Sequence, residues 1–451
     1  MFRILNIFLV LSISIFLIGC NSSGDGDGDD NLTLTLIGED SATLNAIGGL
    51  KSEYEKETGI EIEIVALPFE EAMEKSNQDL RQGNGLYDIL LQYNFSLSSY
   101  VRNNYVHSLD DLTRNIDASK LEFENDLFQA DWEEVGYYYK DFEKPELGIK
   151  KVGYPFASNS MLLVYNKDWF DDPKYQKEFQ ETYGKDLVVP TTWEDLKEIA
   201  EFFTIPEKDM YGITMEGANG GWLYYQWVNM LYGIGGKVMD KKRGWEGDEN
   251  TPIFLNSPQS ISTMEMLLSL KPFNKGNFFD VDMYNQKELM KEGNVALAVM
   301  WSDVLYDLID LNNVESTKFG FSTVPGDKSM NAGGAFFVNK HSKHPNEAMK
   351  FIAWLMEENN QIEMLKKGLC SPRVSIYDDP SVQHIPYLKA LRQSLERGVY
   401  MAEAGPDVDV ITENITKYAQ KVWRGELLPE EAVTQMYSET VSERSKVFTN
   451  F

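Results

Sequence analysis

The feature that most constrains the fold is a regular alternation of strand and helix patterns between residues 32 and 91. Residues 32–37 and 60–65 alternate in the way half-buried strands do, and residues 88–91 form a short apolar strand. Helical spacing fills both intervals between these strands. A succession of strand, helix, strand, helix and strand predicts right-handed βαβ units and a parallel sheet, so we expect an α/β fold.

The two intervening helices are defined by apolar residues three or four positions apart. The first is predicted as one helix that ends at Gly59, because glycine readily adopts the left-handed conformation that closes many helices. The second ends at residues 82–85, a stretch with two glycines. The periodic positions are Leu44, Ile47, Leu50 and Tyr54 in the first helix, and Phe69, Met73, Ser76 and Leu80 in the second.

Polar side chains follow the first and third predicted strands, where a parallel α/β sheet binds its ligands. The segments are residues 38–41 and 92–95. They nominate five candidate binding residues, namely Glu39, Asp40, Gln92, Tyr93 and Asn94.

The N-terminus has the pattern of a secretory signal. Arg3 precedes an apolar run over residues 4–18, which is shorter than the about 20 residues that a membrane-spanning helix needs. The run ends in Leu-Ile-Gly-Cys, which resembles the lipobox of bacterial lipoproteins. The resemblance implies a signal peptide over residues 1–19 and lipidation of Cys20. Residues 20–30, rich in Gly, Ser and Asp, then form a flexible acidic linker.

Length and charge exclude several classes of protein. The chain has 451 residues, more than the roughly 250–300 that one core supports, so at least two lobes are expected. Its net charge of −29 argues against a nucleic-acid partner and against docking on anionic lipid through basic residues. Only Cys20 and Cys370 are cysteines, which excludes a disulfide framework.

Catalytic and metal motifs are lacking in the sequence. Its 4 histidines form no H-E-x-x-H, and there is no phosphate-binding loop, no G-x-S-x-G and no cysteine pair for zinc. We therefore expect a protein that is not an enzyme and that holds no metal and no cofactor. A carboxylate pair of the glycosidase type cannot be recognised by counting in so acidic a chain.

Six segments, in order, resemble the extracellular solute-binding protein family of bacterial ABC importers, in the sugar-binding branch typified by maltodextrin-binding protein. Each motif is weak alone, and the resemblance lies in their order and spacing over nearly the whole mature chain. The segments are 54–60, 86–90, 153–168, 190–196, 291–301 and 331–348.

The resemblance implies a two-lobed periplasmic-binding-protein fold of type II, with a ligand cleft between lobes joined by hinge crossings. The crossings would lie near residues 153–158 and 331–335. The lobe boundaries implied are 31–152 with 336–385 for lobe 1, and 157–332 with 386–451 for lobe 2.

The same resemblance implies a function. The protein would capture a sugar, oligosaccharide or sugar alcohol by hinge closure and deliver it to the permease subunits of an ABC transporter. It would act as an extracytoplasmic monomer that is held at the cell membrane only by its N-terminal lipid.

Aromatic and polar side chains suited to a sugar follow a glycine turn and a second-lobe strand. A sugar ring offers C–H faces to aromatic rings and hydroxyl groups to polar side chains. Residues 220–227 are the densest aromatic segment and contain Trp222, Tyr224 and Tyr225. Trp301 and Asp303 follow the predicted strand 295–299. Trp301 is expected to stack on the ligand, whereas Asp303 is either a hydroxyl acceptor or a helix N-cap.

The resemblance adds four further candidates. Asn159 lies just past the first crossing, where the family often has a polar contact. Gly333 and Gly334 either let the backbone approach the ligand or serve as a hinge, and the hinge is favoured. Arg373 either grips a carboxylate or diol or is an exposed surface residue.

Two other functions stay open from the residues alone. A binding protein for a cationic solute such as a polyamine would use the acidic residues Glu39, Asp40 and Asp303 together with aromatic walls. An extracellular glycan-degrading enzyme would use two of the many carboxylates.

Overall fold

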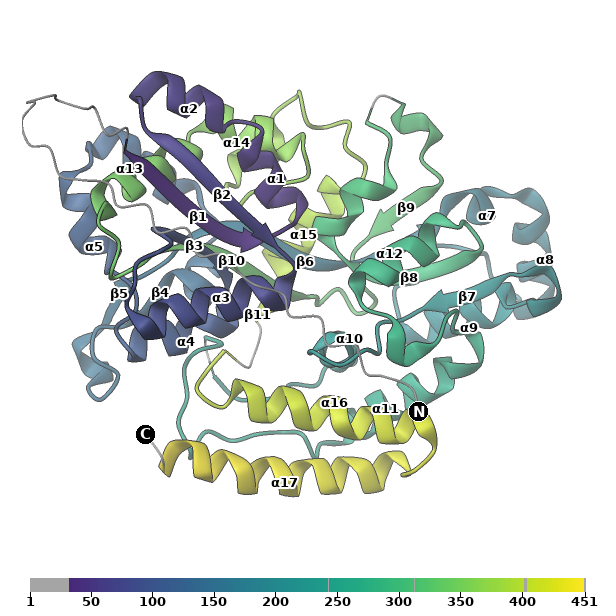
Figure 1. Cartoon of the computed structure of the whole chain (residues 1–451). Coiled ribbons are helices and arrows are strands. Elements are labelled where there is room, and N and C mark those ends of the chain that lie inside the picture. Colours follow the sequence, from purple (N-terminus) through teal and green to yellow (C-terminus); the bar gives the residue numbers. More distant parts are fainter. Residues whose placement is uncertain (1–31, 242, 312, 401–403, 450–451) are drawn as a thin grey trace, which may run out of the picture.

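The structure is a computed structural model that describes residues 32–241, 243–311, 313–400 and 404–449 (Figure 1). The predicted signal peptide, the lipidation site Cys20 and the linker over residues 20–30 lie outside the described residues. No helix in the described ranges is long and apolar enough to cross a membrane.

The first lobe is built on a parallel sheet with strand order β2-β1-β3. This confirms the parallel βαβ arrangement predicted from residues 32–91. Both faces of the sheet are covered by helices, as parallel sheets require, and Figure 1 shows these elements in purple and blue. The elements are β1 (Thr33–Glu39), α1 (Ala42–Gly48), α2 (Lys51–Thr58), β2 (Glu61–Leu67), α3 (Phe69–Gln82), β3 (Ile89–Tyr93) and α4 (Asn94–Arg102).

The single helix predicted before Gly59 is wrong, because the structure has two short helices there. Helix α1 begins where the Ser41 hydroxyl accepts a hydrogen bond from the Leu44 amide, and it ends at Gly49. Two consecutive glycines, Gly48 and Gly49, weaken helix propagation at this point. Helix α2 then ends at Gly59, whose φ of 75° is the expected left-handed cap.

Two long strands carry the chain between the lobes. Strand β6 (Tyr154–Asn166) and strand β10 (Met330–Val338) pair antiparallel, with Ser160 opposite Asn331 and Tyr154 opposite Phe336. The last part of β10 also pairs with β3, whereas the last part of β6 pairs with strands of the second lobe. The result is one continuous sheet with the order β2-β1-β3-β10-β6-β8-β7.

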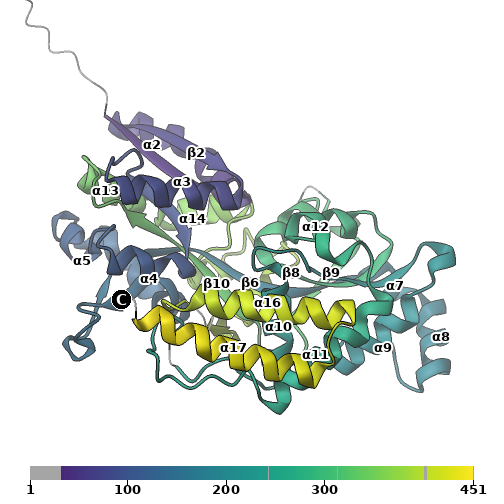
Figure 2. The ribbon, with the colours of Figure 1, turned by 60° about the horizontal axis from the view of Figure 1, so that its bottom comes forward.

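The second lobe surrounds the far end of this sheet, and Figure 2 shows the two lobes on either side of β6 and β10. Strand β8 pairs antiparallel with β6 and parallel with β7. The elements are α7 (Lys167–Asp171), α8 (Pro173–Tyr183), α9 (Trp193–Phe203), β7 (Tyr211–Thr214), α10 (Trp222–Gly233), α11 (Pro258–Leu270), α12 (Met283–Lys291), β8 (Val295–Trp301) and β9 (Phe319–Ser322).

The remaining elements cover the lobes and their junction. Between β3 and β6 lie α5 (Leu109–Leu112), α6 (Gln129–Asp131), β4 (Tyr137–Tyr139) and β5 (Ile149–Lys151). After β10 follow α13 (Pro345–Leu355), α14 (Glu358–Leu365), α15 (Leu388–Arg397), β11 (Val399–Tyr400), α16 (Val408–Arg424) and α17 (Pro429–Thr449).

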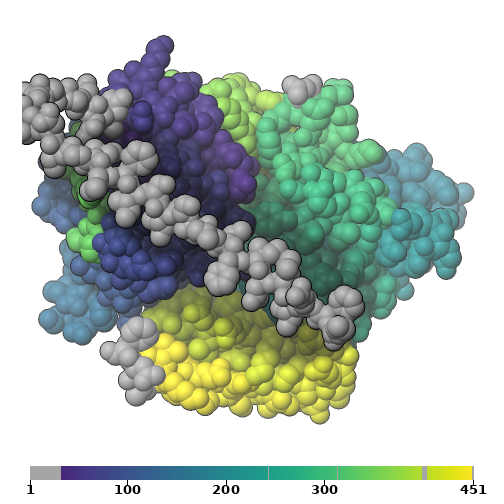
Figure 3. All heavy atoms as spheres, viewed as in Figure 1, coloured from purple at the N-terminus to yellow at the C-terminus, as the bar shows by residue number. Residues whose placement is uncertain are grey.

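Helices α16 and α17 run below both lobes, in yellow at the bottom of Figures 1 and 3. Helix α16 buries one stripe of side chains at helical spacing, namely Ile411, Ile415, Ala419 and Val422. This stripe belongs to the large core of the second lobe, which assigns the C-terminal helices to that lobe.

The buried apolar side chains form one large core in the second lobe and two smaller cores in the first. The large core already includes Cys370, Ile376 and Ile385, although these residues were predicted for the first lobe. The Cys370 thiol donates to the Ser302 hydroxyl of the second lobe at 3.3 Å, whereas Pro372 and Val374 pair through their backbones with residues 126–128 of the first lobe. This segment therefore contacts both lobes, and the boundary near residue 386 stays a prediction.

A buried carboxyl group lies against the crossing strand β6. Asp131, at the end of α6, is 1% exposed and accepts a hydrogen bond from the Ser158 hydroxyl, while its Oδ1 atom has no partner. Burial raises the pKa of Asp131 from 3.8 to about 7. A folded-state pKa above the unfolded value means that the stability linked to this group is present at low pH and is lost as the pH rises toward 7.

We expect Asp131→Asn to flatten the pH dependence of stability. The free energy of unfolding of the unmodified protein should fall between pH 4 and pH 7 by up to about 1.4 kcal/mol per pH unit from this group, and the variant should lack that decrease. Urea unfolding followed by circular dichroism at pH 4.5, 5.5, 6.5 and 7.5 measures the difference. The exposed Asp171→Asn variant is the control, and parallel profiles for Asp131→Asn and the unmodified protein would contradict the prediction.

Candidate functional site

A small, partly open cavity of about 40 Å³ lies between the two lobes. The first lobe contributes side chains at the carboxyl ends of its strands, and the second lobe contributes side chains from α10, α12 and the end of β8. Six of the predicted binding residues meet there, namely Glu39, Tyr93, Trp222, Tyr225, Trp301 and Asp303. Phe69, Phe95, Met283 and Ala332 complete the lining.

Aromatic rings form most of the wall of this cavity. The Tyr225 ring lies edge-on to Trp301 with ring centroids 5.2 Å apart, and edge-on to Trp222 at 6.0 Å. Across the cleft, the Phe69 ring of the first lobe lies 6.2 Å from Trp222. Rings from both lobes therefore offer flat apolar faces to anything held between them.

Glu39 connects the two lobes. It ends β1, is 4% exposed, and accepts a hydrogen bond from the Tyr93 hydroxyl at 2.6 Å. Its other oxygen accepts a hydrogen bond from the hydroxyl of Tyr284, which belongs to α12 of the second lobe. Burial raises the pKa of Glu39, although both tyrosine hydroxyls oppose the shift.

Asp303 lies opposite Glu39 and is 7% exposed. The Asn159 amide of β6 donates to one of its oxygens at 3.1 Å, whereas Asp303 Oδ1 and Asn159 Oδ1 have no hydrogen-bond partner. Burial, and secondarily the charge of Glu39, raise the pKa of Asp303 to about 7. A short 3₁₀ helix spans Ser302–Leu308, and its N-cap residue is Trp301. Asp303 lies inside this helix and is therefore not its N-cap.

Tyr224 and Tyr225 are adjacent on α10 and face different environments. Tyr225 lines the cavity, whereas Tyr224 is 1% exposed and belongs to the core of the second lobe. Tyr224 also borders a wider groove beside the cavity.

Three predicted polar residues near β1 and β3 do not line the cavity. The Gln92 amide donates to the Ser76 hydroxyl at 3.1 Å, and the Asn94 amide donates to Glu134 at 2.7 Å. Both amides therefore form hydrogen bonds inside the first lobe. The exposed Asp40 accepts a hydrogen bond from the Asn45 amide at 3.2 Å. Asp40 borders a second hollow near α12, which shares Met283 and Asp303 with the cavity.

Gly333 and Gly334 lie in β10, where it pairs with β6. A Cβ atom on Gly334 would come within 3.1 Å of Ala157 Cβ and 3.4 Å of the Tyr93 ring. A Cβ atom on Gly333 would come within 3.2 Å of Val135 and 3.3 Å of Glu134. The close approach of these neighbours, rather than an unusual backbone conformation, favours glycine at the crossing.

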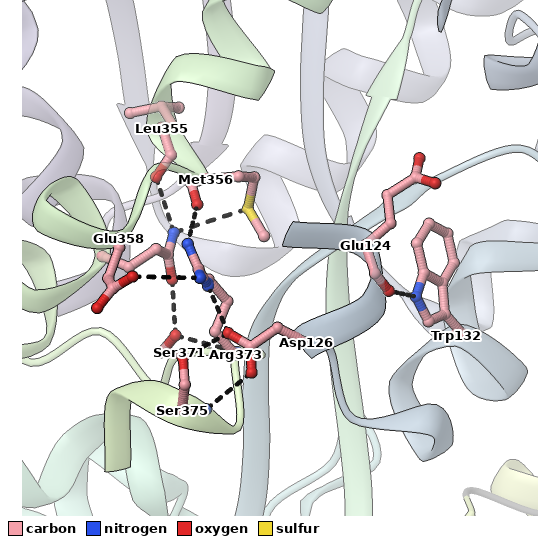
Figure 4. A network of polar contacts seen from close by, with 10 residues as sticks. Glu124, Asp126, Trp132, Leu355, Met356, Glu358, Ser371, Arg373 and Ser375 are labelled. Atoms are coloured by element: carbon pink, nitrogen blue, oxygen red, sulfur yellow. Dashed lines mark hydrogen bonds and ion pairs between the residues drawn. The ribbon is translucent and has the colours of Figure 1, made fainter. Parts of the chain in front are cut away.

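Arg373 lies away from the cavity, in a polar network between the lobe interior and the segment after α14 (Figure 4). Its Nε donates to Asp126 at 2.8 Å and its Nη1 donates to the Met356 carbonyl at 2.9 Å. Its side chain is only 11% exposed. Both predicted roles, an exposed surface arginine and a ligand contact, are therefore replaced by a structural one.

A wider groove of about 600 Å³ adjoins the cavity and shares Phe69, Phe95 and Tyr225 with it. Helix α16 forms its opposite wall with polar side chains that include Thr412, Thr416 and Gln420. The cavity itself is far smaller than the roughly 300–1,000 Å³ of small-molecule sites, whereas the adjoining groove lies within that range. In the described part of the chain, no group of three or more His, Cys, Asp or Glu residues is placed to hold a metal ion.

A comparison with protein families assigns the chain to a family. Residues 49–390 match the family model of the bacterial extracellular solute-binding proteins, which is most of the chain. The chain belongs to this family. Among curated proteins, this solute-binding protein is 21% identical over 372 residues to a probable amino-acid ABC transporter periplasmic-binding protein, y4oP, of Sinorhizobium fredii. That alignment covers 80% of this chain and 78% of the relative.

Solved structures have the same fold. A crystal structure of an ABC transporter solute-binding protein from Agrobacterium radiobacter in complex with ribitol has a TM-score of 0.75 and 22% identity, and the match covers 94% of this chain and 99% of that one. A solute-binding protein from Thermotoga lettingae bound with α-D-tagatose has a TM-score of 0.75 and 20% identity, covering 92% and 100%. The two-lobed periplasmic-binding-protein fold is thus confirmed.

The sequence did not reveal several residues of the site in this solute-binding protein. Phe69 follows β2, and Glu216 follows β7. The rule that ligands bind beyond the carboxyl ends of strands therefore predicts both residues once it is applied to these two strands. Glu216 is fully buried, and burial raises its pKa well above the ordinary value. Tyr284, at the start of α12, has no such signal, because its role depends on how the lobes meet.

The structural role of Arg373 can be measured by substitution. We expect Arg373→Gln to lower the free energy of unfolding by on the order of 3 kcal/mol, because Asp126 would lose the partner of a largely buried ion pair. Arg397→Gln is the matched control, since its pair with Asp327 is exposed and should contribute less than about 1 kcal/mol. Chemical denaturation measures both, and equal effects of the two variants would show that Arg373 has no special structural role.

Proposed function

We propose that this protein is the substrate-binding component of an ABC importer that captures a sugar, an oligosaccharide or a sugar alcohol and delivers it to the permease. In this proposal a lipid on Cys20 holds the protein at the outer face of the cell membrane, and the protein works as a monomer. It binds its solute without converting it.

The observation that carries this proposal is the composition of the cavity. Aromatic faces from both lobes line it together with Asp303, to which Asn159 donates a hydrogen bond, and among the described residues Oδ1 of Asp303 and Oδ1 of Asn159 have no hydrogen-bond partner. Unpaired buried acceptors are unfavourable, and a ligand that brings hydroxyl donors would satisfy them. The C–H faces of the same ligand would pack on Trp301 and Trp222.

Contacts between the lobes support binding by hinge closure. The Tyr284 hydroxyl reaches Glu39 across the cleft, and Phe69 meets Trp222. A solute that touches both lobes binds the closed state better than the open one and therefore shifts the population toward closure. Strands β6 and β10 are the connections about which the lobes would rotate.

The charge of the cavity favours a sugar or sugar alcohol over a free amino acid, the ligand class named for the relative from Sinorhizobium fredii. An amino acid would bury a carboxylate, which needs a cation or several donors. None of the described residues that line the cavity is Lys, Arg or His. The ribitol and α-D-tagatose bound to the two similar structures carry no such group.

A thermal-shift screen tests the proposed ligand class. Ligands that bind only the folded protein raise the melting temperature by mass action. We expect at least one member of a panel of sugars and sugar alcohols to raise it, and the twenty common amino acids to leave it unchanged. NMR of the bound compound after release should show it chemically unaltered. A shift with an amino acid alone, or turnover of a glycoside, would contradict the proposal.

Substitution of the aromatic wall tests the site itself. We expect Trp301→Ala and Trp222→Ala each to weaken binding of the best compound from the screen by at least about tenfold, or 1.4 kcal/mol, because each removes a stacking face. Trp169→Ala is the control, since Trp169 is partly buried in the second lobe near Phe203, away from the cavity. Isothermal titration calorimetry on variants with cooperative melting measures the affinities. Unchanged affinity in both cleft variants would rule out this wall as the binding surface.

A further inference from the structure

The ionisable carboxyl groups in and beside the cavity are not matched by cationic side chains in the cavity wall. Glu39 and Asp303 line it from opposite lobes and are 4% and 7% exposed. Glu216, fully buried, lies close enough for the charge of Asp303 to add to the shift of its pKa. Among the residues that the structure describes, the cavity wall contains no cationic side chain to neutralise these carboxyl groups.

The hydrogen-bond donors to Glu39 and Asp303 are neutral and do not compensate their negative charge. Glu39 accepts only from the neutral hydroxyls of Tyr93 and Tyr284, and Asp303 accepts from the neutral amide of Asn159. The side-chain amide of Gln226, which donates to the Val299 carbonyl at 3.0 Å, also lies beside the Glu216 carboxyl, and among the described residues no cation pairs with Glu216. Neutral donors satisfy oxygen atoms but do not cancel a buried charge.

In the described part of the chain, the unpartnered polar atoms of Asn159 and Asp303 are both oxygens. Ionised carboxylates and an amide oxygen accept hydrogen bonds and do not donate them, and an ammonium group beside Glu39 and Asp303 would favour their ionised form against the burial that raises the pKa of both groups. A hydroxyl group of a neutral sugar could satisfy one such oxygen. An ammonium group would satisfy up to three and would also supply the missing positive charge.

The aromatic wall suits a cation as well as a sugar ring. A cation held over the face of Trp or Tyr is attracted to the ring, and the attraction is strongest where water is excluded. Trp301 and Tyr225 border the same cavity as Asp303, and Tyr93 borders it beside Glu39. The site therefore combines carboxylates, orphaned acceptors and aromatic faces within one small cavity.

We propose that the preferred solute is a polyhydroxy compound carrying a protonated primary amine, such as an amino sugar or an amino sugar alcohol, with its ammonium group held between Asp303 and Glu39. This inference rests on the proposed function, because it names a narrower class of solute for the same cleft. The hydroxyl groups of the solute would extend toward Asn159 and the adjoining polar groove along α16.

Matched pairs of compounds test the inference by titration calorimetry. Sorbitol is compared with its 1-amino-1-deoxy analogue glucamine, and glucose with glucosamine, so that one hydroxyl is exchanged for one ammonium group in each pair. We expect the amine to bind at least tenfold more tightly than its partner in at least one pair at neutral pH. Equal or tighter binding of the neutral partners would overturn the inference and leave the proposed function intact.

Other outcomes separate the two proposals. Tighter binding of putrescine or spermidine than of every amino sugar would overturn the inference in favour of a plain polyamine. If none of the four sugar compounds and no member of the sugar and sugar alcohol panel binds, both the inference and the proposed function are wrong.

A charge-removing variant provides an independent test. Asp303→Asn keeps the shape and the hydrogen bond from Asn159, so the protein should stay folded, and its melting curve verifies this. We expect it to lower glucamine affinity at least tenfold more than it lowers sorbitol affinity, because both compounds lose an oxygen acceptor but only the amine loses its counter-charge. Asp307→Asn is the matched control and should change neither, because Asp307 lies on the same 3₁₀ helix, pairs with Lys287 and has a side chain that is 44% exposed. Equal losses for both compounds in Asp303→Asn would overturn the assigned ammonium position.

Discussion

The pairing of β6 with β10 is the interaction on which the rest of the structure depends. These two strands are antiparallel neighbours in the middle of the sheet, and each continues into a different lobe. Hydroxyl groups of Ser160 and Ser329, 169 residues apart in the chain, meet at 2.8 Å beside this pair. The cleft lies at the carboxyl ends of the strands of both lobes. The register of β6 against β10 therefore determines which side chains of the two lobes face each other across the cleft.

The fold was largely predictable from the sequence because strand alternation and helix periodicity are local signals. The parallel order of β1, β2 and β3 followed from residues 32–91 alone. The break between α1 and α2 was missed, although Gly48 and Gly49 mark it, because the apolar spacing continues through the glycines. The contact of Cys370 with Ser302 was also missed, since the two residues are 68 positions apart and no local pattern encodes their meeting.

The site was predictable to the extent that it obeys a topological rule. Glu39, Tyr93, Trp301 and Asp303 follow strands whose carboxyl ends face the cleft, and all four line the cavity. Arg373 was misplaced, because an arginine in a loop gives no sign of the buried partner Asp126 that it will find. The contact between Tyr284 and Glu39 joins residues of different lobes, and only the assembled structure brings them together.

The position of β10 late in the chain has a consequence for the order of folding. During synthesis β1, β2 and β3 can pair as soon as they emerge, but β3 keeps an unpaired edge until residues 334–338 arrive to cover it. Contacts between such distant segments form slowly, since a long loop must close first. The first lobe must therefore wait, with one exposed strand edge, for more than half of the protein to be made, and this interval is when the chain most needs protection from aggregation.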